Sequence, residues 1–172
     1  KHNLQNAVGA IAIARELGID LETIFATLAD FTGVQHRFEI KGEYHGVLVV
    51  DDYAHHPSAV RNTLAAARHF YHGRIWCVFQ PHLFSRTKYL LHEFAQAFGD
   101  ADICVLADIF PAREADPGDI STADLVKEAR KYHKDIRYVG DFDRIYEHLK
   151  INLQPGDLLI TMGAGDVWKV GE

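Results

Sequence analysis

The stretch VVDDYAHHPSAV, residues 49–60, changes from the pattern of a strand to that of a helix. A run of apolar β-formers ends in two aspartates and two histidines, and Pro57 then opens a segment with the composition of a helix. A strand followed by a polar turn and a helix is half of a βαβ unit. The stretch therefore predicts a strand-to-helix junction whose polar residues lie at the end of the strand.

The same alternation continues toward the C-terminus. Short apolar runs, rich in β-branched residues, are separated by segments of helical length. The runs are VLVV, IWCVF, ICVLAD, IRYV and LLITM, and the helical segments are PSAVRNTLAAARHF, SRTKYLLHEFAQAFG, STADLVKEARKY and DFDRIYEHLK. This alternation predicts an α/β fold with a Rossmann-like, mostly parallel sheet flanked by helices.

The first forty residues follow a different pattern. Apolar residues at helical spacing predict a helix from about residue 3 to residue 17, ended by Gly18, and DLETIFATLADF predicts a second helix capped by Asp20. HRFEIKGEYHG predicts a strand or hairpin with a turn near Gly42. The chain opens inside a helical pattern without an initiator Met, so we expect it to be a piece of a longer protein.

The composition excludes several classes of protein. Hydrophobic residues make up 48% and charged residues 24%, which is typical of a globular domain rather than a disordered one. The net charge of -6 and the lack of a Lys/Arg cluster argue against nucleic acid as a partner. No stretch approaches the ~20 apolar residues of a membrane span. Cys77 and Cys104 lie in apolar runs, which suits buried thiols in a reducing cytoplasm, although a disulfide would be possible in an oxidising compartment.

The residues alone leave three interpretations of the DDYAHHP turn. Carboxylates and imidazoles bind metals, so Asp51, Asp52, His55 and His56 would suit a metallohydrolase. Adjacent strand residues point to opposite faces, however, which disfavours convergence of the two aspartates. Alternatively, His56 caps the helix that Pro57 opens, or one aspartate accepts hydrogen bonds from a ribose diol.

Other loops that follow strands are also candidates, because ligands of parallel sheets bind at the carboxyl ends of the strands. In QPHLFSRT, His82 and Arg86 would form a receptor for a carboxylate or phosphate, with Ser85 as the expected cap of the next helix. In DIFPARE, Arg113 and Glu114 favour an ion pair or a loop anchor over chemistry.

Two weaker signals complete the set. Asn3 and Asn6 are three residues apart on one helical face, which suggests amide recognition of a purine edge. The glycines of GAGD, residues 163–166, permit close approach of the backbone to a ligand.

Taken in this order, the segments resemble the Mur ligases of bacterial cell-wall synthesis. The motifs that carry the resemblance are HNLQNA, FTGVQHRFE, VVDDYAHHP, FQPHLFSRT, DIFPAREADPG and GAGD, and they cover essentially the whole chain. The resemblance implies an enzyme whose N-terminal domain holds a UDP-sugar and whose central P-loop domain holds ATP. It also implies that residues 1–32 are a helical lead-in from the central-domain hinge and that residues 33–172 are the C-terminal domain, which presents the amino acid.

The resemblance further implies a reaction and its participants. ATP would activate the carboxylate of UDP-N-acetylmuramate as an acyl phosphate, which the amine of L-alanine attacks in the cytoplasm. ATP and Mg²⁺ would be bound mainly by the central domain, and no metal by this one. By the same resemblance, ATP would be contacted by Asn3, Asn6, Asp52 and His55, its phosphates would be reached on domain closure by the catalytic Arg37, and the L-alanine carboxylate would be held by His82 and Arg86.

The chain departs from the family pattern at one position and lacks one motif. His36 stands where the alanine-adding members usually carry the first of two arginines, a pattern closer to the D-glutamate-adding member. Because Arg37 is retained, we expect function to survive. The phosphate-binding motif G-x-x-x-x-G-K-[ST] does not occur in these residues, so the isolated chain is expected to be inactive.

Two alternatives to this interpretation remain. One is the murein tripeptide recycling ligase, which shares the DD-aromatic-AHHP turn but typically lacks FQPH after the next strand. The other is a non-catalytic, nucleotide-binding α/β module.

Overall fold

The computed structural model describes the backbone of residues 2–31 and 33–172, with the side chains of residues 4–31 and 33–172. Contacts divide the chain into two compact units, Lys1–Val34 and Gln35–Glu172. The first unit is a pair of helices and the second is an α/β domain. None of the described helices is long and apolar enough to cross a membrane.

Both predicted helices of the first unit are present. α1 spans His2–Glu16 and α2 spans Leu21–Ala29. Asp20 caps α2 as predicted, because its Oδ1 accepts a hydrogen bond from the Thr23 N–H at 2.9 Å. Gly18 follows α1 with a φ of 82°, a conformation that costs glycine little.

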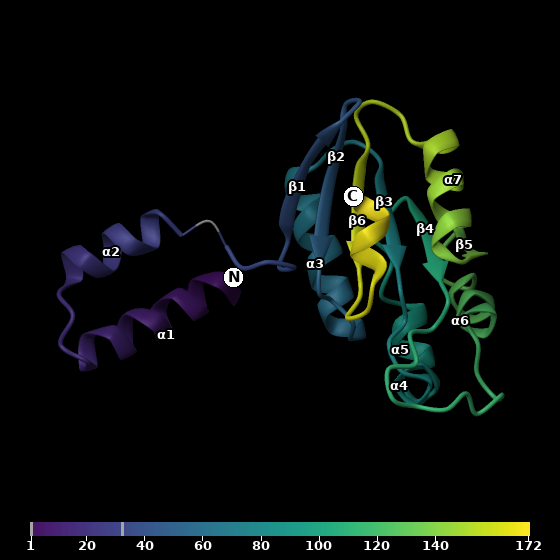
Figure 1. Cartoon of the computed structure of the whole chain (residues 1–172), viewed down its shortest axis with the longest axis horizontal. Coiled ribbons are helices and arrows are strands. Elements are labelled where there is room, and N and C mark those ends of the chain that lie inside the picture. Colours follow the sequence, from purple (N-terminus) through teal and green to yellow (C-terminus); the bar gives the residue numbers. More distant parts are fainter. Residues whose placement is uncertain (1, 32) are drawn as a thin grey trace. The chain divides into compact units, whose positions relative to one another are not determined.

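The second unit contains a six-stranded mixed sheet, which confirms the predicted fold class (Figure 1). Its spatial order is β1-β2-β6-β3-β4-β5. β1 runs antiparallel to β2, and every other neighbouring pair is parallel. The strands are β1 (Glu39–Tyr44), β2 (Val47–Asp52), β3 (Ile75–Phe79), β4 (Ile103–Ala107), β5 (Ile136–Gly140) and β6 (Leu158–Met162).

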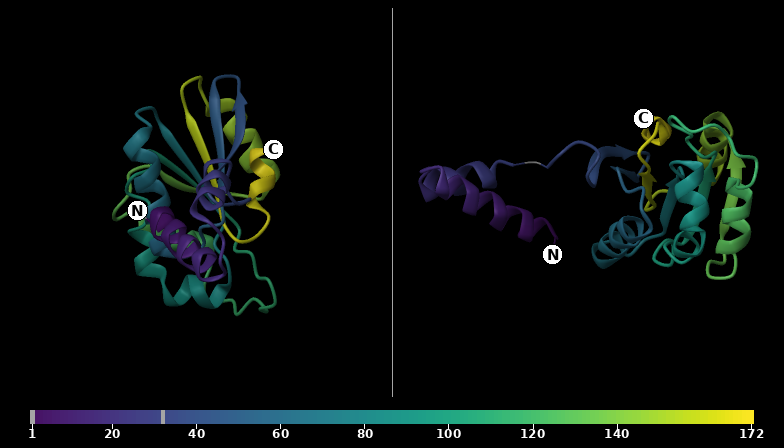
Figure 2. Two further views of the ribbon diagram at one scale, coloured as in Figure 1. Left: turned by 90° about the vertical axis from the view of Figure 1, so that its left-hand side faces the viewer. Right: turned by 90° about the horizontal axis from the view of Figure 1, so that it is seen from below.

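Helices cover both faces of this sheet (Figures 1 and 2). They are α3 (Pro57–Phe70), α4 (Phe84–Tyr89), α5 (Leu91–Ala95), α6 (Thr122–Ala129), α7 (Phe142–Asn152) and the 3₁₀ helix η1 (Val167–Gly171). One apolar core lies between the sheet and α3, α5 and α6, and a second lies between the opposite face and α7 and η1. Burial on both faces explains why the central strands read as continuous apolar runs.

The structure corrects two local predictions. The hairpin turn lies at His45 and Gly46, not near Gly42, because a two-residue turn of this hand requires positive φ at both positions, here 49° and 77°. Gly42 instead lies beside a shift in the β1–β2 register. The helix predicted from SRTKYLLHEFAQAFG is broken at Leu90, which separates α4 from α5.

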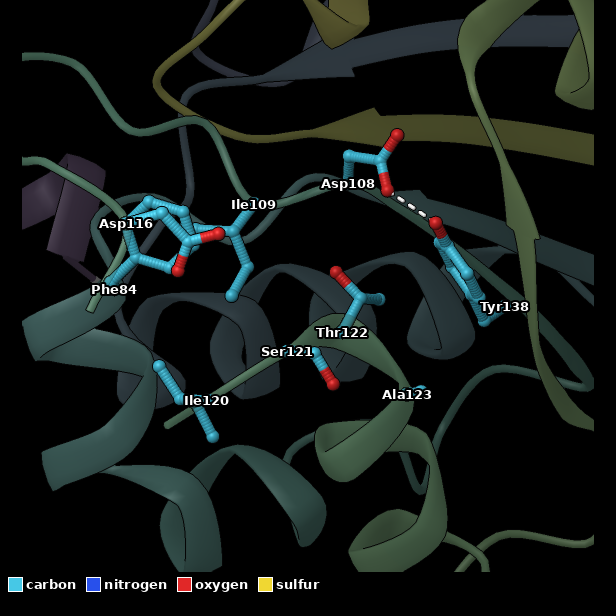
Figure 3. Close-up of a pocket in the computed structure, with 9 residues that line it drawn as sticks. All are labelled: Phe84, Asp108, Ile109, Asp116, Ile120, Ser121, Thr122, Ala123 and Tyr138. Carbon is cyan, nitrogen blue, oxygen red and sulfur yellow. Dashed lines mark hydrogen bonds between the residues drawn. The ribbon is translucent and has the colours of Figure 1, made fainter. Parts of the chain in front are cut away.

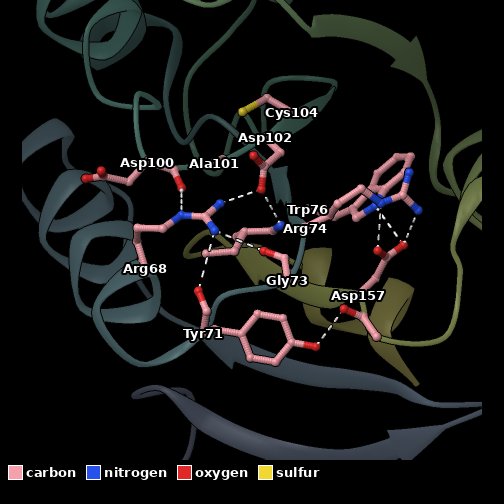
Figure 4. Close-up of polar contacts among 12 residues, drawn as sticks. Arg68, Tyr71, Gly73, Arg74, Trp76, Asp100, Ala101, Asp102, Cys104 and Asp157 are labelled. Atoms are coloured by element: carbon pink, nitrogen blue, oxygen red, sulfur yellow. Dashed lines mark hydrogen bonds and ion pairs between the residues drawn. The ribbon is translucent and has the colours of Figure 1, made fainter.

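Asp157 anchors the amino ends of β3 and β6 (Figure 4). The residue is 2% exposed. Its carboxylate accepts hydrogen bonds from two guanidinium nitrogens of Arg74, at 2.8 and 2.7 Å. It also accepts from Trp76 Nε1 at 3.1 Å and from the Gln154 N–H at 2.8 Å. Four donors therefore satisfy one buried charge at this end of the sheet.

Arg68 makes a similar anchor beside it (Figure 4). Its guanidinium donates to the carbonyl of Gly73 at 2.9 Å, to that of Asp100 at 3.2 Å, and to the carboxylate of Asp102. Asp102 directly precedes β4, so the guanidinium joins α3 to the amino end of that strand.

Candidate functional site

Four loops leave the carboxyl ends of parallel strands at one edge of the sheet. They follow β2, β3, β4 and β6 and begin at residues 53, 80, 108 and 163. Backbone hydrogen bonds join them in pairs: the Gly163 N–H donates to the Asp52 carbonyl at 3.2 Å, and the Leu83 N–H donates to the Phe110 carbonyl at 2.9 Å. The predicted candidate loops therefore form one edge.

Asp52 is buried at the end of β2, and both of its carboxylate oxygens accept from the protein backbone. Oδ1 accepts from the Ala54 N–H at 2.8 Å, and Oδ2 accepts from the Phe38 N–H at 2.9 Å. Burial raises the pKa of Asp52, against the opposing effect of these two N–H groups and of the Arg37 charge. Asp52 thus fastens the turn before β1 to the loop after β2, and its contact with an ATP ribose stays a prediction.

Asp51 makes a separate set of contacts, as expected for adjacent strand residues. Its Oδ2 lies 2.5 Å from His36 Nδ1, and its Oδ1 accepts from Thr161 Oγ1 at 2.6 Å. Glu39 joins this group, because its Oε2 accepts from the His36 N–H at 2.9 Å. The ligand atoms of His36, Glu39 and Asp51 lie within 4.8 Å of one another, close enough to consider a metal ion.

The metallohydrolase set suggested by the sequence is not assembled among the described residues. Asp52 accepts from backbone N–H groups, as described above, and His56 caps α3. The His56 Nδ1 accepts from the Ser58 N–H at 3.4 Å, which confirms the capping interpretation. The histidines and aspartates of the turn therefore make separate contacts and do not converge on one metal site.

A row of cationic and aromatic side chains begins at Arg37. Its guanidinium is exposed and lies over the ring of Tyr53, 5.3 Å from the centroid. The Tyr53 ring packs edge-on against His55 with 5.0 Å between centroids. His55 Nδ1 lies 2.8 Å from the Tyr53 carbonyl, which can only accept, so Nδ1 carries a hydrogen and Nε2 is the acceptor of the neutral ring.

The row continues to His82, whose ring centroid is 5.9 Å from that of His55. His82 Nδ1 lies 3.3 Å from a terminal nitrogen of Arg86. A guanidinium only donates, so Nδ1 accepts and the hydrogen of the ring is on Nε2. Burial lowers the pKa of His82, and the charges of Arg86 and His55 lower it further. A neutral donor beside a permanent cation suits a carboxylate ligand.

Phe110 covers this histidine. The two rings are stacked, with 5.6 Å between centroids and 17° between planes. The backbone of Phe110 also forms a parallel bridge with His82. The loop after β4 therefore fixes the plane of the imidazole, a role that the sequence did not suggest for Phe110.

The prediction that Ser85 caps α4 is wrong. The helix begins after Leu83, whose φ is 71°, and Ser85 lies inside the first turn. Ser85 donates its N–H to Glu114 at 2.9 Å and its hydroxyl to the same carboxylate. These bonds lower the pKa of Glu114. Glu114, in the loop after β4, thus accepts from a free N–H group in the first turn of α4. This contact confirms the loop-anchor interpretation of Glu114.

The GAGD turn lies against Gln80, a residue for which the sequence predicted no role. Gln80 is 6% exposed, and its Oε1 accepts from the Asp166 N–H at 3.0 Å. A Cβ on Gly165 would come within 2.4 Å of that Oε1 and 2.8 Å of Phe110 Cγ. The turn therefore requires glycine at position 165. Gln80 could have been singled out in the sequence, because it is a polar residue directly after a continuous apolar run.

A cavity of about 290 Å³ lies beside this edge, where β4 and β5 end and α6 begins (Figure 3). Asp108 and Tyr138 lie side by side in its wall, where the tyrosine hydroxyl donates to the carboxylate. Burial and this bond raise the pKa of Tyr138, the bond being the larger cause. The other lining residues are Phe84, Ile109, Asp116, Ile120, Ser121, Thr122 and Ala123.

The predicted adenine contacts belong to the helical pair. Asn6 is exposed on α1, and the side chain of Asn3 lies outside the described residues. Both contacts stay predictions.

Comparison with known proteins gives a family match. The model of the family described as "Mur ligase, glutamate ligase domain" matches residues 36–165. The UDP-N-acetylmuramate–L-alanine ligase of Lachnospira eligens is 52% identical over 99% of this chain, and that of Acetivibrio thermocellus is 51% identical over 99%. The chain spans 37% and 36% of the lengths of these curated relatives.

Two solved structures agree with this match. The UDP-N-acetylmuramate-alanine ligase of Thermotoga maritima superposes with a TM-score of 0.81 at 28% identity, over 99% of this chain and 36% of that one. A murein peptide ligase of Psychrobacter arcticus superposes with a TM-score of 0.70 at 26% identity, over 98% of this chain and 35% of that one.

Proposed function

The chain belongs to the Mur ligase family, and we propose that it is the C-terminal, amino-acid-presenting domain of an ATP-dependent ligase that joins L-alanine to UDP-N-acetylmuramate in peptidoglycan biosynthesis. The names and high identity of the curated relatives support this choice over the murein tripeptide recycling ligase. In this proposal residues 1–32 lead in from the central domain, and residues 33–172 are the domain that closes over the substrates.

The pairing of His82 with Arg86 is the observation that carries the proposal. L-Alanine offers a carboxylate, an ammonium and one methyl group. The Arg86 guanidinium and the Nε2–H of His82 would bind the carboxylate from adjacent positions. His55 Nε2, on the neighbouring ring, is an acceptor in its neutral form and suits the amino group or a nucleotide hydroxyl. The row thus fits a small zwitterion next to a nucleotide.

The opposite end of the row suits phosphate. Arg37 is exposed with its guanidinium over Tyr53, so the charge is free to meet the phosphates of ATP after the domains close. Asn3, Asn6 and Asp52 are proposed to contact the adenine and ribose. Mg²⁺, held with ATP mainly by the central domain, would screen the phosphate charge. This domain contributes positioning and charge neutralisation rather than a phosphate cradle.

We place the enzyme in the cytoplasm. Cys77 and Cys104 are both free and fully buried, as predicted, and they lie side by side on β3 and β4 without forming a disulfide. Free thiols suit a reducing compartment.

The full-length protein provides the test. Incubation with UDP-N-acetylmuramate, L-alanine, ATP and Mg²⁺ should release phosphate and form the alanyl product, measured by mass spectrometry. Omission of L-alanine should abolish product, and the murein tripeptide should not replace it. The 172-residue chain alone should form none. Turnover by this chain alone, or a full-length protein that uses the tripeptide but not L-alanine, would contradict the proposal.

A further inference from the structure

We propose that His36 and Asp51 are positioning residues for Arg37: their pairing fixes the turn that presents this arginine. The inference rests on the proposed function, in which Arg37 meets the phosphates.

The turn around Arg37 is held in a conformation that the chain does not favour by itself. His36 and Phe38 have φ values of 57° and 50°, a left-handed region that is uncommon for residues with side chains and strained for a bulky phenylalanine. Such a conformation persists only where surrounding contacts determine it. The residues on both sides of Arg37 therefore need external partners.

Those partners come from the end of β2. The Phe38 N–H donates to Asp52, as described above, and the Tyr53 N–H donates to the His36 carbonyl at 2.6 Å. The His36 side chain is bound by Asp51. The backbone on each side of Arg37 is thus attached to residues 52 and 53, and the His36 side chain to residue 51, at the end of a strand whose position the sheet sets.

Asp51 is itself immobilised. The residue is 3% exposed, and Thr161 on β6 donates to its second oxygen. The side chain of His36 is 40% exposed, and its ring is held by the bond to this carboxylate and by the Trp168 ring, whose centroid is 6.0 Å away. The Arg37 side chain is exposed too, with the Tyr53 ring beneath it, so its direction depends on the turn that carries it.

The geometry favours a hydrogen bond over a metal ion between these groups. His36 Nδ1 and Asp51 Oδ2 are 2.5 Å apart, which is within hydrogen-bonding distance and closer than two ligands of one metal ion lie to each other. Glu39, the third member, already has Lys41 Nζ 3.6 Å from its Oε1.

Kinetics of the full-length protein test the inference. His36→Ala should lower kcat by about 10- to 100-fold, because a group misplaced by about 1 Å loses catalysis on this scale. The KM for L-alanine should change less than threefold, since His82 and Arg86 do not contact the turn. His36→Arg, which keeps a donor for Asp51, should recover at least half of the lost rate on a logarithmic scale.

A double-mutant cycle separates positioning from a merely structural role. If His36 acts through Arg37, adding His36→Ala to Arg37→Ala should cause no further loss of kcat. Asp51→Ala should give the same pattern and serves as the second variant. His45→Ala is the matched control: His45 also has a positive φ, of 49°, and packs on a tyrosine, but it lies in the hairpin turn at the opposite end of β2. It should leave kcat unchanged.

Two results would overturn the inference. One is additive losses in the cycle, which would make His36 independent of Arg37. The other is a normal kcat in His36→Ala with its folding intact. Failure of the proposed function looks different, because the unmodified full-length protein would then form no alanyl product and the cycle would have no starting rate.

Discussion

Replacing Arg86 by alanine removes the cation nearest to the proposed alanine carboxylate. The guanidinium contacts His82 at 3.3 Å and no carboxylate within the described residues, so its charge is available to a ligand. A charge-assisted hydrogen bond contributes about 1.5–3 kcal/mol. Losing it corresponds to a rise of about 10- to 100-fold in the KM for L-alanine. Arg86→Lys should recover only part of this, because an ammonium cannot make a planar two-pronged contact.

The structure adds a pH signature to this prediction. Burial and the Arg86 charge both lower the pKa of His82, so the ring is neutral at pH 7 and loses its acceptor nitrogen only when pH falls below that lowered value. Without Arg86 the pKa of His82 should rise toward its ordinary value. Protonation keeps the Nε2–H donor and adds a positive charge, so lowering the pH should partly restore the affinity of Arg86→Ala for L-alanine, at a pH where His82 of the unmodified enzyme is still neutral.

Steady-state kinetics, with each substrate varied in turn between pH 5.5 and 8, would measure both effects. Lys88→Ala is the control, because Lys88 lies on the same helix and its ammonium pairs with Asp119 at 2.5 Å. Equal weakening of L-alanine, ATP and the UDP-sugar in Arg86→Ala would refute the reasoning. It would show that Arg86 supports the fold and that the alanine site lies elsewhere.

Other substitutions probe the remaining parts of the domain. In the full-length enzyme, Arg37→Ala should mainly lower kcat, and an unchanged kcat would make this arginine structural. Asp52→Ala should weaken ATP binding, measured by calorimetry, and an unchanged affinity would leave Asp52 as a fastener of the turn alone. Gly165→Ala should lower activity by displacing Gln80 or Phe110, without a matching fall in thermal stability. Asp157→Asn should lower the free energy of unfolding by roughly 2–4 kcal/mol in urea titrations, because it breaks a buried charge pair whose arginine is partly exposed, while kcat stays unchanged.

The sheet and its ligand-binding edge were predictable because each depends on local patterns. Continuous apolar runs such as IWCVF mark strands buried on both faces, and the polar residues that follow them must then lie at one edge. His82 and Arg86 are four residues apart across a tight turn, so their proximity also followed from the sequence. The roles of these residues came from the family resemblance, not from their spacing.

Contacts between distant segments could not be predicted in this way. Ser85 has the composition of a helix cap, but Glu114 in another loop satisfies the helix start, and Leu83 takes the unusual φ. Gly42 suggested a turn because glycine is frequent there, whereas it marks a register shift inside a strand. Gln80 was missed because its partner, the Asp166 N–H, is 86 residues away in the sequence.

The buried anchors at the amino ends of the strands have an evolutionary consequence. Asp157 and Arg68 hold the sheet together through hydrogen bonds with Arg74, Trp76, Gly73 and Asp102, none of which belongs to a loop at the ligand-binding edge. Mutations in those loops therefore leave the anchors untouched and cost the sheet little. A lineage built on this scaffold can therefore change what binds at that edge by altering loops, while the sheet beneath them stays folded.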